Sequence, residues 1–532
     1  MNMTSLTKFS LSIFAGLFFI LSTNIELSNA TTYFVATTGS DSNPGTNTQP
    51  LRTIAKGVKV LSAGDTLFVK AGTYSESIRS TQISIPNGTS WNNPITIAAN
   101  PGDIVTIKPL ADNAFFWILD GQSKFLTIKG FVIDGANKAL HGFKFEGGTK
   151  YVRVTDCEIK NSKHSGILVT TPSQAADKIQ TFHEFINLRV HHNGSTGNDH
   201  GFYINTSNNL VASSQFYNNK GNGGKFYHAN FDGVANNNIA RNNKFFDNST
   251  SGVWSCGLIL SSGNGNQAYN NIAYGNFAGF CIQSRVTNSR IYNNLAYEND
   301  YYGIYVGLST TSGSRVENNT TYQNGTYGIF VGDSATNTTV KNNISVSNPI
   351  DLGLKVATTN SNNLITDPSF INAAAKDFHL KSNSSAIDKG TSISGITTDL
   401  DGKGRPKGAQ FDIGAYEYQG SGSTSTSGST STSGSTTTTS TFPPPMASPA
   451  PGTTLTTSTV TFTGAHTSED LEHLLRVGTS YGGSELYNQK LGTAHSASVS
   501  GLPTRGTIYI SWWTRNSSGW FASRATYTMN VN

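Results

Sequence analysis

Histidines gather in one part of this chain. Seven of its 11 histidines fall between residues 141 and 228, namely His141, His164, His183, His191, His192, His200 and His228. Imidazole exchanges a proton near neutral pH, so these side chains could act as general acids or bases. Residues 120–245 also hold 14 Lys and Arg against nine Asp and Glu, whereas residues 246–380 hold six against eight. A basic, histidine-rich segment favours an anionic substrate.

The run Asp-His-Gly-Phe-Tyr at residues 199–203 is the most specific local pattern. Side chains of a strand alternate between two faces, so if the Phe points into a core, Tyr203 points outward close to His200. The run at residues 223–228 follows about one repeat later and could bring further polar side chains beside this pair. We predict that the catalytic residues are among His164, His200, Tyr203, Lys225 and His228.

Five further residues are candidates for binding an anionic substrate. An Arg can hold a carboxylate through two parallel hydrogen bonds, and a Tyr ring can pack against a sugar. The predicted substrate-binding residues are Lys144, Arg153, Arg189, His141 and Tyr305. The alternative role for the histidines is structural, because polar side chains at the turns of a repeating coil can hydrogen-bond along the stack.

Candidate metal ligands are sparse. No His-Glu-x-x-His spacing occurs, and the carboxylates of the middle repeats are scattered rather than stacked one repeat apart. Calcium stays a candidate cofactor, held by oxygen ligands that would converge from distant repeats, and we expect no organic cofactor. The densest acidic group, residues 399–401, lies beyond the repeats, where we predict a structural role or the binding of a structural ion rather than catalysis.

The residues above lie on a repeating pattern. A pair Asn-Asn followed by a short strand recurs every 23 to 28 residues, starting at Asn242, Asn270, Asn293, Asn318 and Asn342. A Gly followed by an alternating strand recurs as well, starting at Gly142, Gly166, Gly201, Gly257, Gly279, Gly303 and Gly328. The first and third residues after each Gly are nearly all apolar and should point into a core. A period of this length is typical of a solenoid.

Two or three short strands per repeat, with no helix between them, predict an all-β coil of parallel strands. Asn side chains should stack along the coil axis at the turns. The second residue after each Gly should form an outward stripe, made of Lys144, Leu168, Tyr203, Ile259, Cys281, Tyr305 and Phe330. Cys256 and Cys281 occupy different positions of the repeat, so we expect them to be buried thiols rather than a disulfide.

The remaining segments have different compositions. A positive residue, an apolar run and small residues before Ala30 predict a signal peptide. Apolar spacing near residues 51–61 predicts a short helix that closes the start of the coil. The expected organisation is a signal peptide (1–30), a β-helix with both caps (31–418, the second cap from about 365), a Ser/Thr/Gly/Pro linker (419–446) and a small β-sandwich (447–532).

Several of these segments resemble a known superfamily. Residues 39–45, 64–66 and 71–74 resemble the start of many secreted bacterial proteins of the pectate-lyase-like superfamily, and residues 367–417 resemble their C-terminal cap. The resemblance implies a right-handed parallel β-helix over most of residues 32–418. The last segment resembles accessory modules of fibronectin-III or immunoglobulin type. The superfamily includes polysaccharide lyases, hydrolases, uronan epimerases and non-enzymatic adhesins.

These observations together favour a secreted polysaccharide lyase that cleaves an acidic, uronate-containing polysaccharide by β-elimination. The alternatives are a uronan C5-epimerase or a glycoside hydrolase on the same fold, or a carbohydrate-binding protein or adhesin without enzymatic activity. No basic run suggests nucleic acid as a partner, and no segment after the signal peptide is apolar enough to span a membrane. We expect an extracellular or cell-surface monomer.

Overall fold

The computed structural model describes residues 30–119, 121, 123–171, 174–228, 234–248, 254–355, 358–420, 446–449, 453–464, 472–479, 486–516 and 519–531. The predicted signal peptide, apart from its last residue, and linker residues 421–445 lie outside the described residues. The chain divides into two compact units, residues 1–422 and 423–532. In the described part of the chain, no helix has the length and apolar character needed to cross a membrane.

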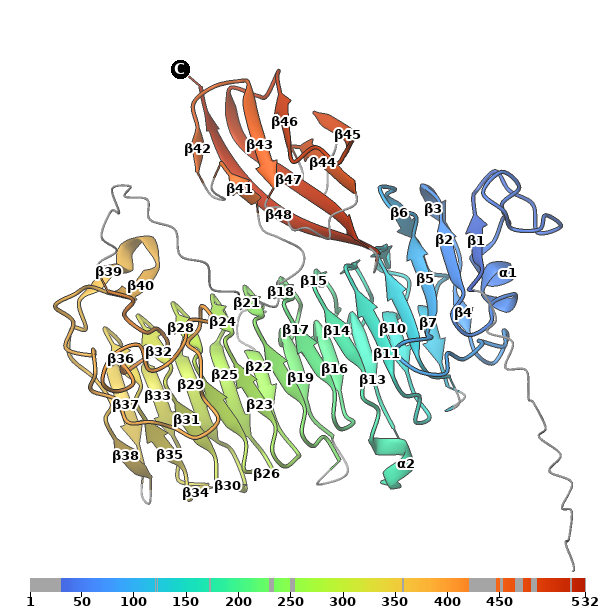
Figure 1. Ribbon diagram of the computed structural model, residues 1–532. Helices are drawn as coiled ribbons and strands as arrows, with labels where there is room; N and C mark the ends of the chain where they lie inside the picture. The colour runs from blue at the N-terminus through green and yellow to red at the C-terminus, as the bar shows by residue number, and fades with distance from the viewer. Residues whose placement is uncertain are drawn as a thin grey trace, which may run out of the picture. The chain divides into compact units, whose positions relative to one another are not determined.

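The first unit is a coil of parallel strands, in which each turn adds one strand to each of three long sheets (Figure 1). Sheet A contains β1 (Thr32–Val35), β2 (Thr66–Val69), β5 (Ile95–Ala99), β8 (Leu126–Lys129), β11 (Val152–Thr155), β14 (Glu184–Ile186), β17 (Leu210–Ala212), β20 (Ile239–Arg241), β23 (Gln267–Tyr269), β27 (Arg290–Tyr292), β31 (Arg315–Glu317), β35 (Thr339–Lys341) and β38 (Thr359–Ser361).

Sheets B and C have 11 strands each, so the coil makes about 11 turns. Sheet B contains β3 (Gly72–Tyr74), β6 (Val105–Ile107), β9 (Val132–Asp134), β12 (Glu158–Lys160), β15 (Arg189–His191), β18 (Gln215–Tyr217), β21 (Lys244–Phe246), β24 (Ile272–Tyr274), β28 (Leu295–Tyr297), β32 (Thr320–Tyr322) and β36 (Ile344–Val346). Sheet C contains β4 (Ile78–Arg79), β7 (Ala114–Ile118), β10 (His141–Phe145), β13 (Ile167–Val169), β16 (Phe202–Ile204), β19 (Gly224–Phe226), β22 (Cys256–Leu260), β25 (Ala278–Gln283), β29 (Tyr302–Gly307), β33 (Tyr327–Val331) and β37 (Ile350–Leu354).

Two smaller elements lie outside the three long sheets of the coil. A short parallel sheet is formed by β26 (Val286–Thr287), β30 (Thr311–Ser312) and β34 (Ala335–Thr336), and α2 (Ala176–Ile179) lies between β13 and β14. The coil interior is a continuous apolar core. In sheet C the first and third residues after the repeated Gly are buried in this core, as at Phe202 and Ile204. The predicted all-β parallel coil and its inward positions are therefore confirmed.

The two residues of each Asn-Asn pair have different structural roles. The first Asn turns the backbone with a positive φ, for example 57° at Asn242 and 51° at Asn293, a conformation that Asn tolerates better than most residues. The second Asn forms a ladder inside the turn. Asn294 Oδ1 accepts the backbone N–H of Asn271 one turn earlier (2.9 Å), and Asn294 Nδ2 donates to Asn319 Oδ1 (3.0 Å). The predicted stacking of Asn along the axis is thus confirmed.

Three such ladders run parallel to the coil axis. Their members satisfy backbone N–H groups that leave the strands, which buried polar groups require. Between sheets A and B the ladder contains Asn243, Asn271, Asn294, Asn319, Asn343 and Asn363. Between sheets B and C it contains Asn193, Asn219, Asn248, Asn276, Asn299, Asn324 and Asn348, and between sheets C and A it contains Asn209, Asn238 and Asn266.

The N-terminal end of the coil is closed by α1 (Ile54–Lys59), which confirms the predicted helix. Thr53 caps this helix, because its hydroxyl accepts the backbone N–H of Lys56 (3.1 Å). The buried face of α1 presents Ile54 and Val58 to the core of the coil.

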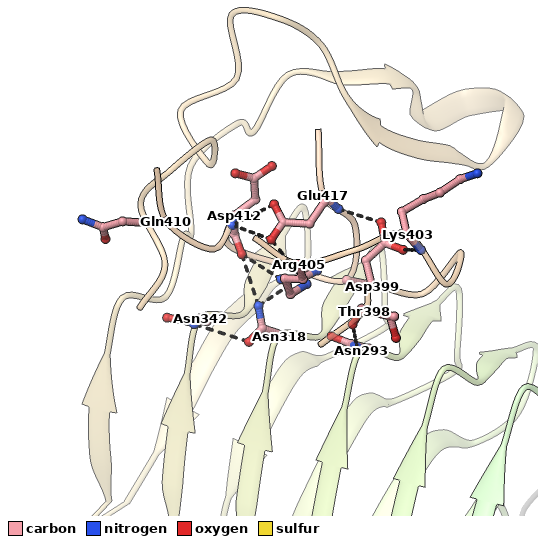
Figure 2. A network of polar contacts seen from close by, with 12 residues as sticks. Asn293, Asn318, Asn342, Thr398, Asp399, Lys403, Arg405, Gln410, Asp412 and Glu417 are labelled. Carbon is pink, nitrogen blue, oxygen red and sulfur yellow. Dashed lines mark hydrogen bonds and ion pairs between the residues drawn. The ribbon is translucent and has the colours of Figure 1, made fainter. Parts of the chain in front are cut away.

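The C-terminal cap begins with β39 (Phe370–Asn372), the 3₁₀ turn η1 (Ala373–Ala375) and β40 (Asp377–Leu380). Beyond it the chain is held by buried apolar residues and by a network of polar contacts (Figure 2). Asp399 accepts the backbone N–H groups of Lys403 (2.8 Å) and Glu417 (2.9 Å). The buried Arg405 donates to the carbonyl groups of Asp412 (3.0 Å) and Gly414 (2.9 Å). These contacts support the structural role predicted for the acidic group at residues 399–401.

The cap is fastened to the coil by the turn-forming Asn residues. Asn293 Nδ2 donates to the Thr398 carbonyl (2.7 Å), and Asn318 Nδ2 donates to the Asp412 carbonyl (3.1 Å) (Figure 2). The outward amide groups of successive turns thus bind the returning chain.

One expectation about the cysteines is wrong. Cys256 and Cys281 form a disulfide, with their Cα atoms 6.3 Å apart, and Cys157 is the buried free thiol. The register pairs Cys256 with Ala278, and three residues of straight strand would separate the two cysteines by about 10 Å along the strand. The two strands are therefore not straight here, and both cysteines belong to one apolar cluster, separate from the main core of the coil.

The second unit contains two small sheets. One comprises β41 (Met446–Ser448), β43 (Val460–Gly464) and β46 (Ser496–Val499), and the other β42 (Thr454–Leu455), β44 (Glu472–Gly478), β45 (Tyr487–Gly492), β47 (Arg505–Asn516) and β48 (Gly519–Asn530). Residues of both sheets share a core that includes Phe462, Leu475 and the fully buried Trp512.

Replacing one rung of a ladder should destabilise the whole coil. In Asn294→Ala, the Asn271 N–H, the Ala268 carbonyl and Asn319 Oδ1 stay buried but lose their hydrogen bonds to the Asn294 side chain. We expect the free energy of unfolding to fall by about 3 kcal/mol. Urea denaturation of the full chain measures it, with the exposed Asn92→Ala as the control variant. Equal midpoints for both variants would show that the ladder contributes nothing to stability.

Candidate functional site

One row of outward side chains runs the length of sheet C, because successive strands pair in register. The row contains Arg79, Trp117, Lys144, Leu168, Tyr203, Lys225, Ile259, Cys281, Tyr305 and Phe330. The predicted outward stripe is therefore aligned as expected. The character of the row changes along the axis. Cationic and polar side chains occur up to Lys225, and mainly apolar side chains occupy the row after it.

Lys225 lies at the boundary between the two halves of this row. Its Nζ is 4.0 Å from the ring centroid of Tyr227 and 6.0 Å from that of Tyr203. Among the described residues, no carboxylate or hydrogen-bond acceptor contacts this Nζ. Burial lowers the pKa of the Lys225 amine to about 8, because the charged form loses hydration without gaining an anion. A lysine in this state can take up a proton near neutral pH.

Two tyrosines form the surroundings of this lysine. The rings of Tyr203 and Tyr227 stack with their centroids 6.3 Å apart. Burial raises the pKa of the Tyr203 phenol to about 12, so that the hydroxyl keeps its proton. A neutral phenol beside a partly deprotonated amine provides an acid and a base on one face of the coil.

His200 is buried at the edge of the same face. Its Nδ1 accepts the backbone N–H of Asn222 (3.1 Å), which assigns the ring proton to Nε2. Burial, with a smaller contribution from the charge on Lys225, lowers the pKa of His200 to about 3. The neutral ring lies edge-on to Tyr203, with centroids 5.7 Å apart. His200 is therefore neutral and packs against Tyr203.

The other predicted histidines of this corner are close neighbours. The rings of His141 and His164 are 5.8 Å apart, and His164 Nδ1 lies 3.0 Å from Asp199 Oδ1. Asp199 also accepts the backbone N–H of Thr196 (2.8 Å). Burial lowers the pKa of His141 to about 4, and its Nδ1 contacts the Ser165 carbonyl at 2.7 Å. The predicted grouping of His141, His164 and His200 at one corner is found.

Arg153 and Arg189 are not brought to this face. Arg153 lies in β11 of sheet A and pairs with Glu184 (2.7 Å). Arg189 lies in β15 of sheet B and pairs with Glu158 (3.1 Å). Because each arginine sits on another sheet and already contacts a carboxylate, we leave both out of the candidate site.

Three further predicted residues lie on or beside sheet C. His228 lies two residues after the end of β19, and its Nε2 contacts the Thr171 carbonyl (3.0 Å). Lys144 lies three turns before Lys225 in the row and pairs with Glu146 (3.3 Å). Tyr305 is only 7% exposed. The expectation that Tyr305 offers an open ring to a sugar is therefore wrong, because other aromatic residues cover it.

Two residues of the site were not predicted. Tyr227 lies two positions after Lys225, so strand alternation could have placed it on the same face. Arg285 lies at a turn with a φ of 59°, donates to the His228 carbonyl (2.9 Å) and lies 5.8 Å from the Tyr227 ring centroid. Its position depends on turn geometry, which the repeat pattern does not encode.

The chain matches a family of known β-helix proteins. The sequence model described as Pel9A-like, right handed beta helix region, matches residues 33–363. The chain belongs to the Pel9A-like family. This membership confirms the expected right-handed β-helix and the resemblance to pectate-lyase-like proteins. No curated protein sequence matches the chain.

Several solved structures are similar to this chain. Pectate lyase Pel9A is 19% identical, with 74% of this chain and 98% of that chain covered and a TM-score of 0.47. XylC in complex with xylose is 12% identical, with 73% and 99% covered and a TM-score of 0.50. The A-module of the mannuronan C-5 epimerase AlgE4 from Azotobacter vinelandii is 14% identical, with 57% and 91% covered and a TM-score of 0.40. At 12% identity the likeness to XylC shows the fold alone.

The described residues of this Pel9A-like coil do not identify ligands for the calcium ion that the sequence analysis kept as a candidate cofactor. Within the described ranges, no three His, Cys, Asp or Glu side chains converge in a way that could hold a metal ion. Asp232 lies outside the described residues. No step of the reaction below is derived through calcium.

Removing the amine of Lys225 should stabilise the coil. The folded state lowers the pKa of this group from about 10.5 to about 8, so the charged form costs stability at every pH below 8. This loss of folding stability decreases as the pH rises from 8 towards 10.5. We expect Lys225→Met to melt at a higher temperature than the unmodified protein at pH 7, and the difference to shrink by pH 10. Calorimetry at both pH values measures it, with Lys341→Met as the control variant; a pH-independent difference would refute the lowered pKa.

Proposed function

We propose that this protein is a polysaccharide lyase that cleaves an acidic, uronate-containing polysaccharide by β-elimination. The observation that carries the proposal is Lys225, an amine with a pKa lowered to about 8 on the outer face of sheet C. The fold is common to lyases, epimerases and hydrolases, so the chemistry has to be argued from the side chains.

β-Elimination needs a base, an acid and positive charge near a carboxylate. The neutral Lys225 amine takes the proton from C5 of the uronate, and the C4–O4 bond breaks as a C4=C5 double bond forms. Tyr203 gives its phenolic proton to the departing O4. Proton exchange with solvent then restores the charge states of Lys225 and Tyr203.

The neighbouring residues would support these two groups. His200 holds the ring of Tyr203, since its own ring is locked by the hydrogen bond from Asn222. Arg285 lies beside the Tyr227 ring and adds positive charge near Lys225. Lys144 adds positive charge three turns away along the same row. This distribution suits a polyanion that lies parallel to the coil axis.

We also propose that the protein acts outside the cell. Lys8 and the apolar run at residues 9–21, followed by small residues before Ala30, have the features of a secretory signal. A polymeric substrate is consistent with a site on an open outer face.

The lyase reaction can be followed by the ultraviolet absorbance of the C4=C5 product. We expect absorbance to rise when the protein is incubated with at least one member of a panel of pectate, alginate, glycosaminoglycan and rhamnogalacturonan. Lys225→Met should lower kcat by about 10²–10⁴-fold, because the base is lost, and Tyr203→Phe by about 10²-fold. Lys341→Met, on sheet A, is the matched control and should keep full activity.

A flat absorbance trace on every polymer would contradict the lyase proposal. Analysis of sugar stereochemistry and chain length in the same samples would then separate the remaining activities. Inverted C5 centres would indicate an epimerase, shortened chains without the double bond a hydrolase, and unchanged polymers a binding protein.

The pH dependence of the reaction should report Lys225. The base must be neutral, so kcat/KM should rise with pH and level off above about 8, where the amine has lost its proton. Tyr203, with a pKa of about 12, stays protonated across this range. Initial rates between pH 5 and pH 10 measure the profile; a maximum below pH 6 would point to a carboxylate or His base in place of Lys225.

A further inference from the structure

Aromatic side chains cover the outer face of sheet C beyond Lys225. We call Trp254, Phe277, Tyr301, Tyr302 and Tyr327 the aromatic patch. Trp254 lies 4.9 Å from the Phe277 ring and 5.7 Å from the Tyr302 ring. Phe277 and Tyr301 stack at 5.3 Å with an interplanar angle of 5°. The patch lies over Tyr305, whose ring is 5.2 Å from Trp254.

Part of this patch is open to solvent. Trp254 is 42% exposed and Tyr301 is 40% exposed. The disulfide between Cys256 and Cys281 lies in the apolar cluster beneath them, so the rings rest on a base that is covalently fixed. Large aromatic side chains that remain exposed on a rigid support are typical of binding surfaces.

The aromatic patch continues the corner on which the candidate site lies. Asn222, which donates its N–H to His200, accepts the backbone N–H of Cys256 in the next turn (2.7 Å). The register then leads from Cys256 to Ala278 and from Ala278 to Tyr302. Tyr302 is thus four turns from His200, roughly 19 Å along the axis at about 4.8 Å per turn. An extended oligosaccharide along sheet C would meet both regions.

The charge around the patch differs from that around Lys225. Residues 254–284, 301–314 and 318–332 contain no Lys, Arg, His, Asp or Glu. Asp300 directly precedes the exposed Tyr301 in the sequence, whereas Arg285, Asp333 and Lys355 follow the ends of β25, β33 and β37. The carboxylate of Asp300 would repel a uronate carboxylate rather than bind it. The apolar faces of neutral sugar rings can pack on the aromatic rings without this penalty.

We infer that the aromatic patch is a distal subsite for neutral sugar residues. The natural substrate is then an acidic heteropolysaccharide in which neutral sugars accompany the uronate cleaved at Lys225, and not an uninterrupted polyuronate. This substrate class rests on the proposed lyase function, whereas sugar binding by the patch can be measured without any turnover.

Binding to the inactive Lys225→Met variant of the full chain tests the inference. The probes are hexasaccharides of alternating rhamnose and galacturonate, oligogalacturonate hexamers, cellohexaose and xylohexaose. Their binding is measured by calorimetry and by tryptophan fluorescence. We expect at least one probe that contains neutral sugars to bind, and Trp254→Ala or Tyr301→Ala to raise its Kd about tenfold. Binding of oligogalacturonate should not change. Ile104→Ala removes an exposed apolar side chain elsewhere and is the control variant.

Two results would overturn the inference. One is that no probe with neutral sugars binds, or that every Kd is unchanged in both aromatic variants. The other is that the aromatic variants weaken the oligogalacturonate alone. The two aromatic variants are compared at equal thermal stability, and Trp254→Phe should restore most of the affinity if ring packing is the cause. A flat lyase assay combined with a patch-dependent Kd would reject the proposed reaction and retain the subsite.

Discussion

The in-register stacking of turns is the constraint on which the rest of this structure depends. Each turn leaves backbone N–H groups at its corners, and the ladders of Asn side chains satisfy them from the neighbouring turn. Because these hydrogen bonds need the same residue at the same corner, they fix which side chains meet along the outer faces. Tyr203 and Lys225 are 22 positions apart in the sequence, and the register makes them direct neighbours.

The chemistry of the candidate site follows from burial more than from charge pairing. Lys225 lies among tyrosine rings, and among the described residues no carboxylate offsets its charge, which keeps its pKa low. His200 is buried as a neutral ring, and Tyr203 keeps its proton for the same reason. An ion pair between Lys225 and a carboxylate would instead keep the lysine protonated. The coil therefore gives up some stability at one turn to keep a proton acceptor.

The coil could be predicted from the sequence because the same strand and turn pattern recurs many times along the chain. The alternation after each Gly predicted the inward residues such as Phe202 and the outward row that contains Tyr203. Lys225 and its position beside Tyr203 also followed from this pattern. The sequence could not show that Tyr305 is covered, since Trp254 reaches it from an irregular segment. The disulfide was missed for a similar reason, because the two cysteines are closer together than straight strands in this register would place them.

The same limit applies to the arginines. Composition indicated a basic half, but charge counts contain no information about which of three sheets a residue faces. Arg153 and Arg189 prove to lie on sheets A and B with carboxylate partners. Arg285, which does approach Tyr227, is placed by one turn with a positive φ. Strand positions are therefore predictable from periodicity, whereas turn residues need the folded backbone.

The most direct test of the account is the crystal structure of the Lys225→Met variant with a bound uronate-containing oligosaccharide. The account predicts sugar density along the outer face of sheet C, with a uronate C5 atom facing position 225 and the chain running towards Trp254 and Tyr301. Density on the outer face of sheet A or sheet B, or on the second unit alone, would contradict the central claim that this row of sheet C is the substrate site.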